Sequence, residues 1–63
     1  MKHEIEDGKI EITCEYPEYI AIWDSATCEL IAYYNGMEYD YLGEFTDLSD
    51  AEGAFSDYVD ETQ

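Results

Sequence analysis

Apolar and polar residues alternate along residues 2–16, and the alternation is interrupted only at Asp7-Gly8. The apolar residues on the two sides of this pair are Ile5, Ile10, Ile12, Cys14 and Tyr16. Alternation is typical of strands with one buried face, and Asp-Gly favours a two-residue turn with positive φ at both positions. The pattern therefore predicts a hairpin in which Glu6 faces Lys9. In the same register Glu4 faces Glu11, and such a like-charge pair destabilises a sheet.

Residues 19–42 are the most apolar part of the chain and contain its only Trp. After a turn at Pro17, residues 18–24 are apolar at nearly every position, which indicates a strand flanked on both sides. A turn at residues 24–27 precedes a second hairpin centred on Asn35-Gly36. The predicted register places on one apolar face Leu30, Ala32, Tyr34, Met37, Tyr39 and Tyr41. It places on the other face Glu29, Ile31, Tyr33, Glu38, Asp40 and Leu42.

A helix over residues 25–34 is the alternative for part of this stretch. Ser25 would be its N-cap, and Asn35-Gly36 would form a left-handed C-cap. Thr27, Ile31 and two adjacent tyrosines favour the strand, because β-branched and aromatic residues fit a pleated surface. The sequence alone leaves both possibilities open.

The period of the apolar residues changes after Thr46. Apolar residues then fall three, three, one, three and one positions apart, at Leu48, Ala51, Ala54, Phe55, Tyr58 and Val59. This is the stripe of an amphipathic helix, predicted over residues 50–60, with Ser49 and Glu52 as a capping box. We expect an α+β fold, with an antiparallel sheet of four or five strands and one C-terminal helix packed on one face, as a single domain over residues 1–63.

The charge is extreme for so short a chain. Two lysines against seventeen acids give 2 − 17 = −15 with His3 neutral. Self-repulsion opposes folding, and Asp57, Asp60 and Glu61 stand at the end of the helix that prefers cations. The chain is nevertheless 46% hydrophobic, which is too much for a disordered acidic tail. One Val and no Arg speak against adaptation to brine, so we expect the charge to serve binding.

Residues that carry catalysis are sparse. His3 is the only histidine, and Lys2 and Lys9 are the only side-chain amines. No Ser or Cys stands in a nucleophile motif, and the carboxylates are too numerous for their proximity to indicate acid–base chemistry. Residues 43–53 are rich in acids but lack the ligand spacing of a calcium loop. We expect no enzyme, no cofactor and no metal.

The sequence also bounds location and partners. Residues 1–9 lack the apolar segment of a signal peptide, and no run reaches the roughly 18 apolar residues of a spanning helix, so we expect a cytoplasmic protein without membrane contact. Cys14 and Cys28 are expected to be small buried hydrophobes, although their pairing stays open. The absence of a basic patch argues against direct binding of nucleic acid.

The spacing of the acids suggests a basic partner instead. Residues two apart on a strand stand about 6.6 to 6.8 Å apart on one face, close to the roughly 6 to 7 Å between successive phosphates of nucleic acid. Three pairs have this spacing or twice it: Glu4 with Glu6, Glu38 with Asp40, and Glu11 with Glu15. Solvated outer faces are the simpler explanation of each pair taken alone. The predicted partner-binding residues are Glu4, Glu6, Glu11, Glu15, Glu29, Tyr33, Glu38 and Asp40.

In size, charge and mixed architecture the whole chain resembles small acidic proteins of bacteriophages and mobile elements that imitate DNA. Among these are anti-restriction and anti-CRISPR proteins, most of all an anti-CRISPR against a type I complex, although no family motif is present. The resemblance implies a monomeric, non-catalytic inhibitor in the host cytoplasm, bound to the DNA-binding surface of a bacterial defence complex such as a CRISPR effector. The alternative is a generic acidic interaction module that binds a basic protein.

Overall fold

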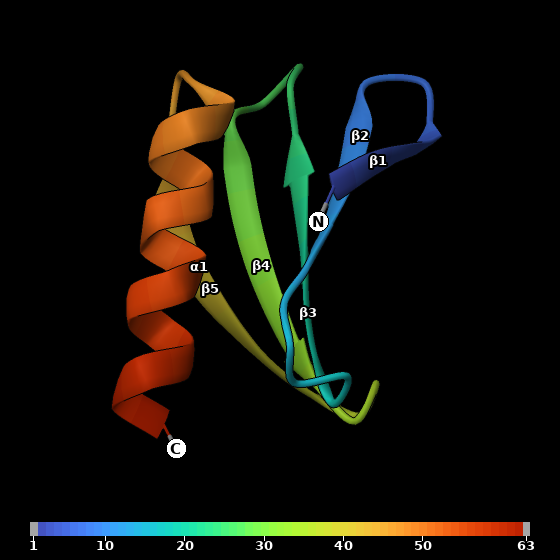
Figure 1. Ribbon diagram of the computed structural model, residues 1–63. Helices are drawn as coiled ribbons and strands as arrows, with labels where there is room; N and C mark the ends of the chain where they lie inside the picture. The colour runs from blue at the N-terminus through green and yellow to red at the C-terminus, as the bar shows by residue number, and fades with distance from the viewer. Residues whose placement is uncertain (1, 63) are drawn as a thin grey trace.

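The computed structural model describes residues 2–62, without the side chain of Glu38. It contains one antiparallel sheet of five strands in chain order, followed by a single helix (Figure 1). The elements are β1 (Lys2–Glu6), β2 (Lys9–Thr13), β3 (Tyr19–Asp24), β4 (Glu29–Tyr34), β5 (Glu38–Glu44) and α1 (Leu48–Thr62). The predicted α+β fold is confirmed.

Residues 25–34 do not form the alternative helix, because β4 begins at Glu29. The preceding turn is held by Asp24, whose Oδ1 accepts a hydrogen bond from the Ala26 amide at 2.9 Å and whose carbonyl accepts one from the Cys28 amide at 2.6 Å. Cys28 adopts a φ of 66°, in the left-handed region, and this returns the chain to the sheet beside β3.

The first hairpin differs from the predicted register. Glu6 faces Lys9 as expected, but the pairing then slips, so that Glu4 faces Ile10 and His3 faces Glu11. The predicted facing of Glu4 and Glu11 is therefore wrong. A bulge at Ile5 causes the slip. One extra residue between Glu6 and Glu4 shifts residues 2–4 by one position and so turns their side chains to the other face. Positive φ occurs at Gly8, with 80°, but not at Asp7.

The second hairpin has the predicted turn and a different register. Asn35 and Gly36 have φ values of 56° and 70°, and the Met37 amide donates to the Tyr34 carbonyl at 3.2 Å. The strand then pairs one residue later than predicted, and the observed pairs are Tyr34 with Glu38, Tyr33 with Tyr39, Ala32 with Asp40 and Ile31 with Tyr41. Met37 stays 84% exposed in the loop, outside these pairs. The predicted faces of β5 are therefore exchanged between residues 38 and 41.

The helix covers the apolar face of the sheet, as its stripe predicts (Figure 1). It is longer than the predicted 50–60, and its first turn is capped differently. The Asp47 carboxylate accepts from the Ser49 amide at 3.0 Å, and the Asp47 carbonyl accepts from the Ala51 amide at 3.1 Å. Asp47 is thus the N-cap. The Ser49–Glu52 capping box is wrong, and Glu52 instead pairs with Lys2 at 3.1 Å.

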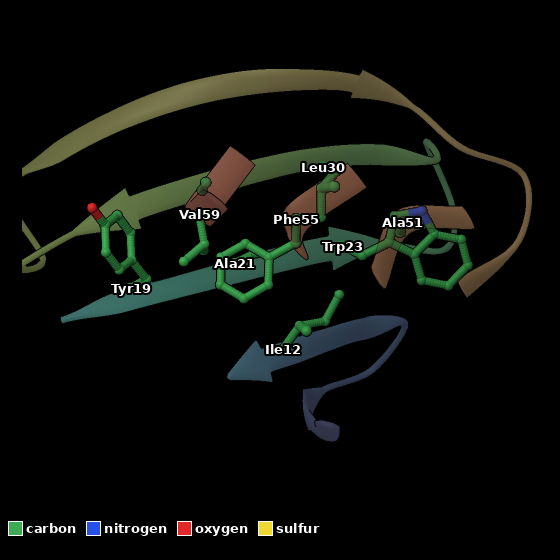
Figure 2. Packing of buried hydrophobic residues seen from close by; sticks show 9 residues of the cluster. Ile12, Tyr19, Ala21, Trp23, Leu30, Ala51, Phe55 and Val59 are labelled. Atoms are coloured by element: carbon green, nitrogen blue, oxygen red, sulfur yellow. The ribbon is translucent and has the colours of Figure 1, made fainter. Parts of the chain in front are cut away.

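Side chains from α1 and from three strands meet in one core layer (Figure 2). Its buried members are Ile12, Tyr19, Ala21, Trp23, Leu30, Ala32, Ala51, Phe55 and Val59. Ala21 and Ala32 of the strands are fully buried in this layer, and Phe55 of α1 has 2% of its surface exposed. Trp23 Nε1 donates to the Phe45 carbonyl at 2.9 Å and so ties β3 to the connection between β5 and α1. Cys14 and Cys28 are half-buried free thiols.

Candidate functional site

The side of the sheet opposite α1 is called here the open face. Cross-strand partners point to the same side of a sheet, so the register assigns residues to it. Ile22 pairs with Ile31, and Ile31 pairs with Tyr41. One step further from the β3–β4 turn, Ile20 pairs with Tyr33, and Tyr33 pairs with Tyr39. Two neighbouring rows of the open face are therefore mostly apolar or aromatic.

This apolar patch is accessible to a partner. Tyr39 is 69% exposed, Tyr41 54% and Ile5 43%, whereas Ile22 and Ile31 are half-buried by their neighbours. The rings of Tyr33 and Tyr39 lie with centroids 6.2 Å apart in a tilted arrangement. Contiguous exposed apolar surface on a folded protein marks an interaction surface more often than isolated apolar residues do.

A line of charged residues crosses the strands along one border of this patch. In the register Glu6 faces Lys9, Lys9 faces Asp24, and Glu29 faces Glu44, while Asp24 and Glu29 flank the turn that joins β3 to β4. We call the four acids of this line, Glu6, Asp24, Glu29 and Glu44, the acidic row. Neighbouring members on adjacent strands are separated by about 4.7 to 4.9 Å in the backbone.

The acidic row includes a like-charge pair that no sequence pattern predicted. Glu29 and Glu44 face each other directly, a placement that costs stability. Their effect reaches the phenol beside them: partial desolvation, and then the negative charges of Glu44 and Glu29, raise the pKa of Tyr41 above its ordinary value of 10.0.

Cations lie at the opposite edge. Over residues 2–62 the ion pairs are Lys2 with Glu52 at 3.1 Å, His3 with Glu11 at 3.3 Å when the imidazole is protonated, and Lys9 with Glu6 at 3.3 Å. All three basic residues belong to β1 and β2, and the sequence contains no Lys, Arg or His after Lys9. Within the described residues, three members of the acidic row take part in no ion pair: Asp24, Glu29 and Glu44. Lys9 faces Asp24 across the strands, but its ammonium is paired with Glu6.

A hollow of about 240 Å³ lies between the acidic row and the apolar patch. Its lining residues are Ile5, Glu6, Lys9, Ile22, Asp24, Glu29, Ile31 and Tyr33. It thus combines an apolar floor with a charged side, on which the carboxylates outnumber the one cation, Lys9.

A second hollow, of about 340 Å³, opens beside the end of α1. Tyrosines line it, and the Tyr58 hydroxyl donates to Asp40 Oδ2 at 2.9 Å. The rings of Tyr19 and Tyr34 lie 5.0 Å apart, and the Thr62 hydroxyl donates to the Tyr19 hydroxyl at 3.1 Å. These polar groups bond to one another, which makes this hollow part of the packing between α1 and the sheet.

The structure brings together half of the predicted partner-binding residues. Those that lie on the open face are Glu6, Glu11, Glu29 and Tyr33. Glu4 and Asp40 point to the helix side, because they pair with Ile10 and Ala32, and Glu15 lies beyond the end of β2. The side chain of Glu38 lies outside the described part of the structure. Partner binding by any of these residues remains a prediction.

Sequence reasoning missed Asp24, Glu44, Tyr39 and Tyr41 as neighbours on one face. The placement of Tyr39 and Tyr41 depends on the shifted register of the hairpin, and that of Glu44 on the irregularity between Leu30 and Ile31, where Leu42 is the extra residue of β5. Gly43, with a φ of 123°, was the available signal, because a glycine inside a strand often marks a bulge.

Two further observations bear on function. Over residues 2–62, no three His, Cys, Asp or Glu side chains are grouped so that they could hold a metal ion. A helix with the length and apolarity needed to cross a membrane is likewise not found in the described part of the chain. Comparison with protein-family models, curated proteins and solved structures gave no match to this chain.

Proposed function

We propose that this chain is a non-catalytic inhibitor that covers a basic, nucleic-acid-binding surface of another protein with its open face. The observation that carries the proposal is the acidic row beside an exposed aromatic patch, because Asp24, Glu29 and Glu44 take part in none of the ion pairs of the described residues. Its resemblance to acidic phage proteins points to a bacterial defence complex, such as a CRISPR effector, as the target.

The facing of Glu29 and Glu44 supports this role. Two carboxylates held side by side repel each other in the free protein, and a cation of the partner relieves the repulsion on binding. Part of the cost that the pair imposes on the fold is thereby recovered in the complex. The row matches nucleic acid in sign but not in spacing. Members on adjacent strands stand about 4.8 Å apart in the backbone, and Glu6 and Asp24 are two strands apart, whereas successive phosphates are roughly 6 to 7 Å apart.

The apolar patch adds a contribution that DNA cannot make. Burial of apolar surface gains about 25 cal/mol per Å² and depends little on salt, whereas attraction between charges is screened. Aromatic residues inside a charged rim are also the usual composition of the residues that dominate a protein interface. Affinity for the partner should therefore fall less steeply with salt than the partner's affinity for DNA.

A competition experiment tests the proposal. The immobilised protein captures partners from a bacterial lysate, and double-stranded DNA is added as competitor during capture and again with the purified partner. We expect nucleic-acid-binding proteins that DNA displaces. Glu29→Lys/Glu44→Lys should bind at least tenfold more weakly, whereas Asp57→Lys/Asp60→Lys, with the same change in net charge on the outer surface of α1, should bind nearly normally.

Equal loss of binding in the two double variants would contradict the assignment to the open face. If DNA did not displace the captured partner, nucleic-acid mimicry would be contradicted. The second candidate function would then remain, in which this chain is a module that binds a basic protein without affinity for nucleic acid. One observation favours this second candidate. The bulge at Ile5 places Glu4 and Glu6 on different faces, so the predicted ladder of carboxylates along β1 is not formed.

A further inference from the structure

We propose that the hollow beside the acidic row receives an arginine side chain of the partner. This proposal rests on the proposed function for the existence of a basic partner. The choice of arginine follows from the lining of the hollow, which supplies a different surface for each part of that side chain.

The floor suits the aliphatic stem and the plane of the guanidinium. Ile22 and Ile31 are paired neighbours on adjacent strands, and both are half-buried, so their exposed atoms form a fixed apolar surface. Long cationic side chains lay their methylene groups on such surfaces while the charged end stays near water. The ring of Tyr33, in the same lining, provides a face on which a guanidinium stacks.

The carboxylates of the hollow differ in availability. Glu6 is already paired with Lys9 at 3.3 Å, whereas Asp24 and Glu29 have no ion-pair partner in the described part of the chain. Asp24 is held in place because its Oδ1 accepts from the Ala26 amide, which leaves Oδ2 for a donor from outside. Glu29 is steadied by the Thr27 hydroxyl, which donates to Oε1 at 3.3 Å. Acceptors fixed before binding lose little conformational entropy on binding.

Arginine fits this arrangement better than lysine does. Its guanidinium is planar, donates along two edges and stacks on aromatic rings, so it can meet Asp24 and Glu29 while it lies on Tyr33. An ammonium group is a compact point charge that is more strongly hydrated. A second copy of this chain is a poor occupant, because two molecules of charge −15 repel each other.

The test uses small probes and needs no knowledge of the partner. Backbone amide resonances of the full-length protein are followed during titration with N-acetyl-arginine amide, N-acetyl-lysine amide and, as the uncharged analogue, N-acetyl-citrulline amide. We expect saturable shifts at Ile22, Glu29, Ile31 and Tyr33 with the arginine probe, weaker shifts with lysine and none with citrulline. Equal responses to arginine and lysine would overturn the proposal in favour of general attraction of cations.

Glu29→Gln and Glu44→Gln form a matched pair of variants. Each removes one charge from the facing pair, but only Glu29 lines the hollow. The arginine probe should bind roughly tenfold more weakly to Glu29→Gln, as expected for a lost charge-assisted contact, and nearly normally to Glu44→Gln. Equal weakening would overturn the pocket. If the arginine probe bound but no partner were displaced by DNA, the proposed function alone would be contradicted. If a partner bound both variants equally, only the assignment of its arginine to this hollow would be contradicted.

Discussion

The two faces of the sheet both carry apolar residues, but α1 covers only one of them. On the covered face, Ala21 and Ala32 are fully buried beneath α1. On the open face the paired residues of the same strands are Ile22 and Ile31, which are larger and remain partly accessible. The comparison teaches that apolar character alone does not mark the face on which a helix packs, because both faces carry apolar residues and only one is covered by α1. Under the proposed function, the apolar surface left without cover contacts the partner.

The largest effect should separate the two faces by stability. Phe55→Ala removes the side chain that fills the core and should cost about 3 to 5 kcal/mol of unfolding free energy. Tyr39→Ala, at a residue 69% exposed on the open face, should cost no more than about 1 kcal/mol, which includes its ring contact with Tyr33. Urea denaturation followed by tryptophan fluorescence measures both.

A chain of this size has little stability to spare, and Phe55→Ala could leave it unfolded. Val59→Ala provides a graded alternative, because loss of two buried methyl groups should cost about 1.5 kcal/mol. If Tyr39→Ala proved as damaging as Val59→Ala, the open face would be part of the structural core and the contrast between the faces would fail.

A smaller effect should come from the acidic row. Glu44→Lys converts the pair with Glu29 from like charges into opposite charges and should stabilise the fold by about 0.2 to 1 kcal/mol. The gain should shrink as NaCl is raised, since the screening length is about 10 Å at 0.1 M. Glu15→Lys, at an exposed residue beyond the end of β2, makes the same change in net charge. Equal gains from both variants, measured by thermal unfolding, would show that overall charge matters and the pair does not.

The smallest effect concerns the phenol of Tyr41. Its raised pKa means that the folded state holds the phenolic proton more tightly than the unfolded state. Well below pH 10 the phenol is protonated in both states, so its contribution to the free energy of unfolding does not change with pH. The fold loses stability as the pH rises past 10 through the pKa of the folded state. Glu44→Gln should lower this pKa toward 10.0, and Glu15→Gln should leave it unchanged. Titration of ¹³C-labelled tyrosine by NMR measures the pKa. An unchanged pKa of Tyr41 in Glu44→Gln would show that the acidic row does not influence this phenol.

The amino-acid sequence predicted elements better than it predicted faces. The 3.6-residue stripe from Leu48 to Val59 is compatible with only one buried face of a helix, and every apolar residue in it contacts the core. Residues 38–41 alternate acid with tyrosine, and tyrosine is stable on a buried or an exposed face. Their orientation depended on where the extra residues of the hairpin lie, and alternation does not encode that position.

The candidate site was only partly predictable for the same reason. Glu29 and Tyr33 were assigned correctly to the outer side of the sheet, because their strand has no irregularity relative to β3. Glu44 and Asp24 reach the same row through a bulge and a turn, so their proximity follows from three-dimensional pairing.

The confinement of Lys2, His3 and Lys9 to the first hairpin has a consequence at long range. It makes the charge of the sheet uneven, with its less negative end at β1 and its more negative end at β5. In the field of a positively charged surface such a molecule rotates before it touches. Encounters are then biased toward one orientation. At low ionic strength the association rate constant therefore rises more than the lifetime of the complex does.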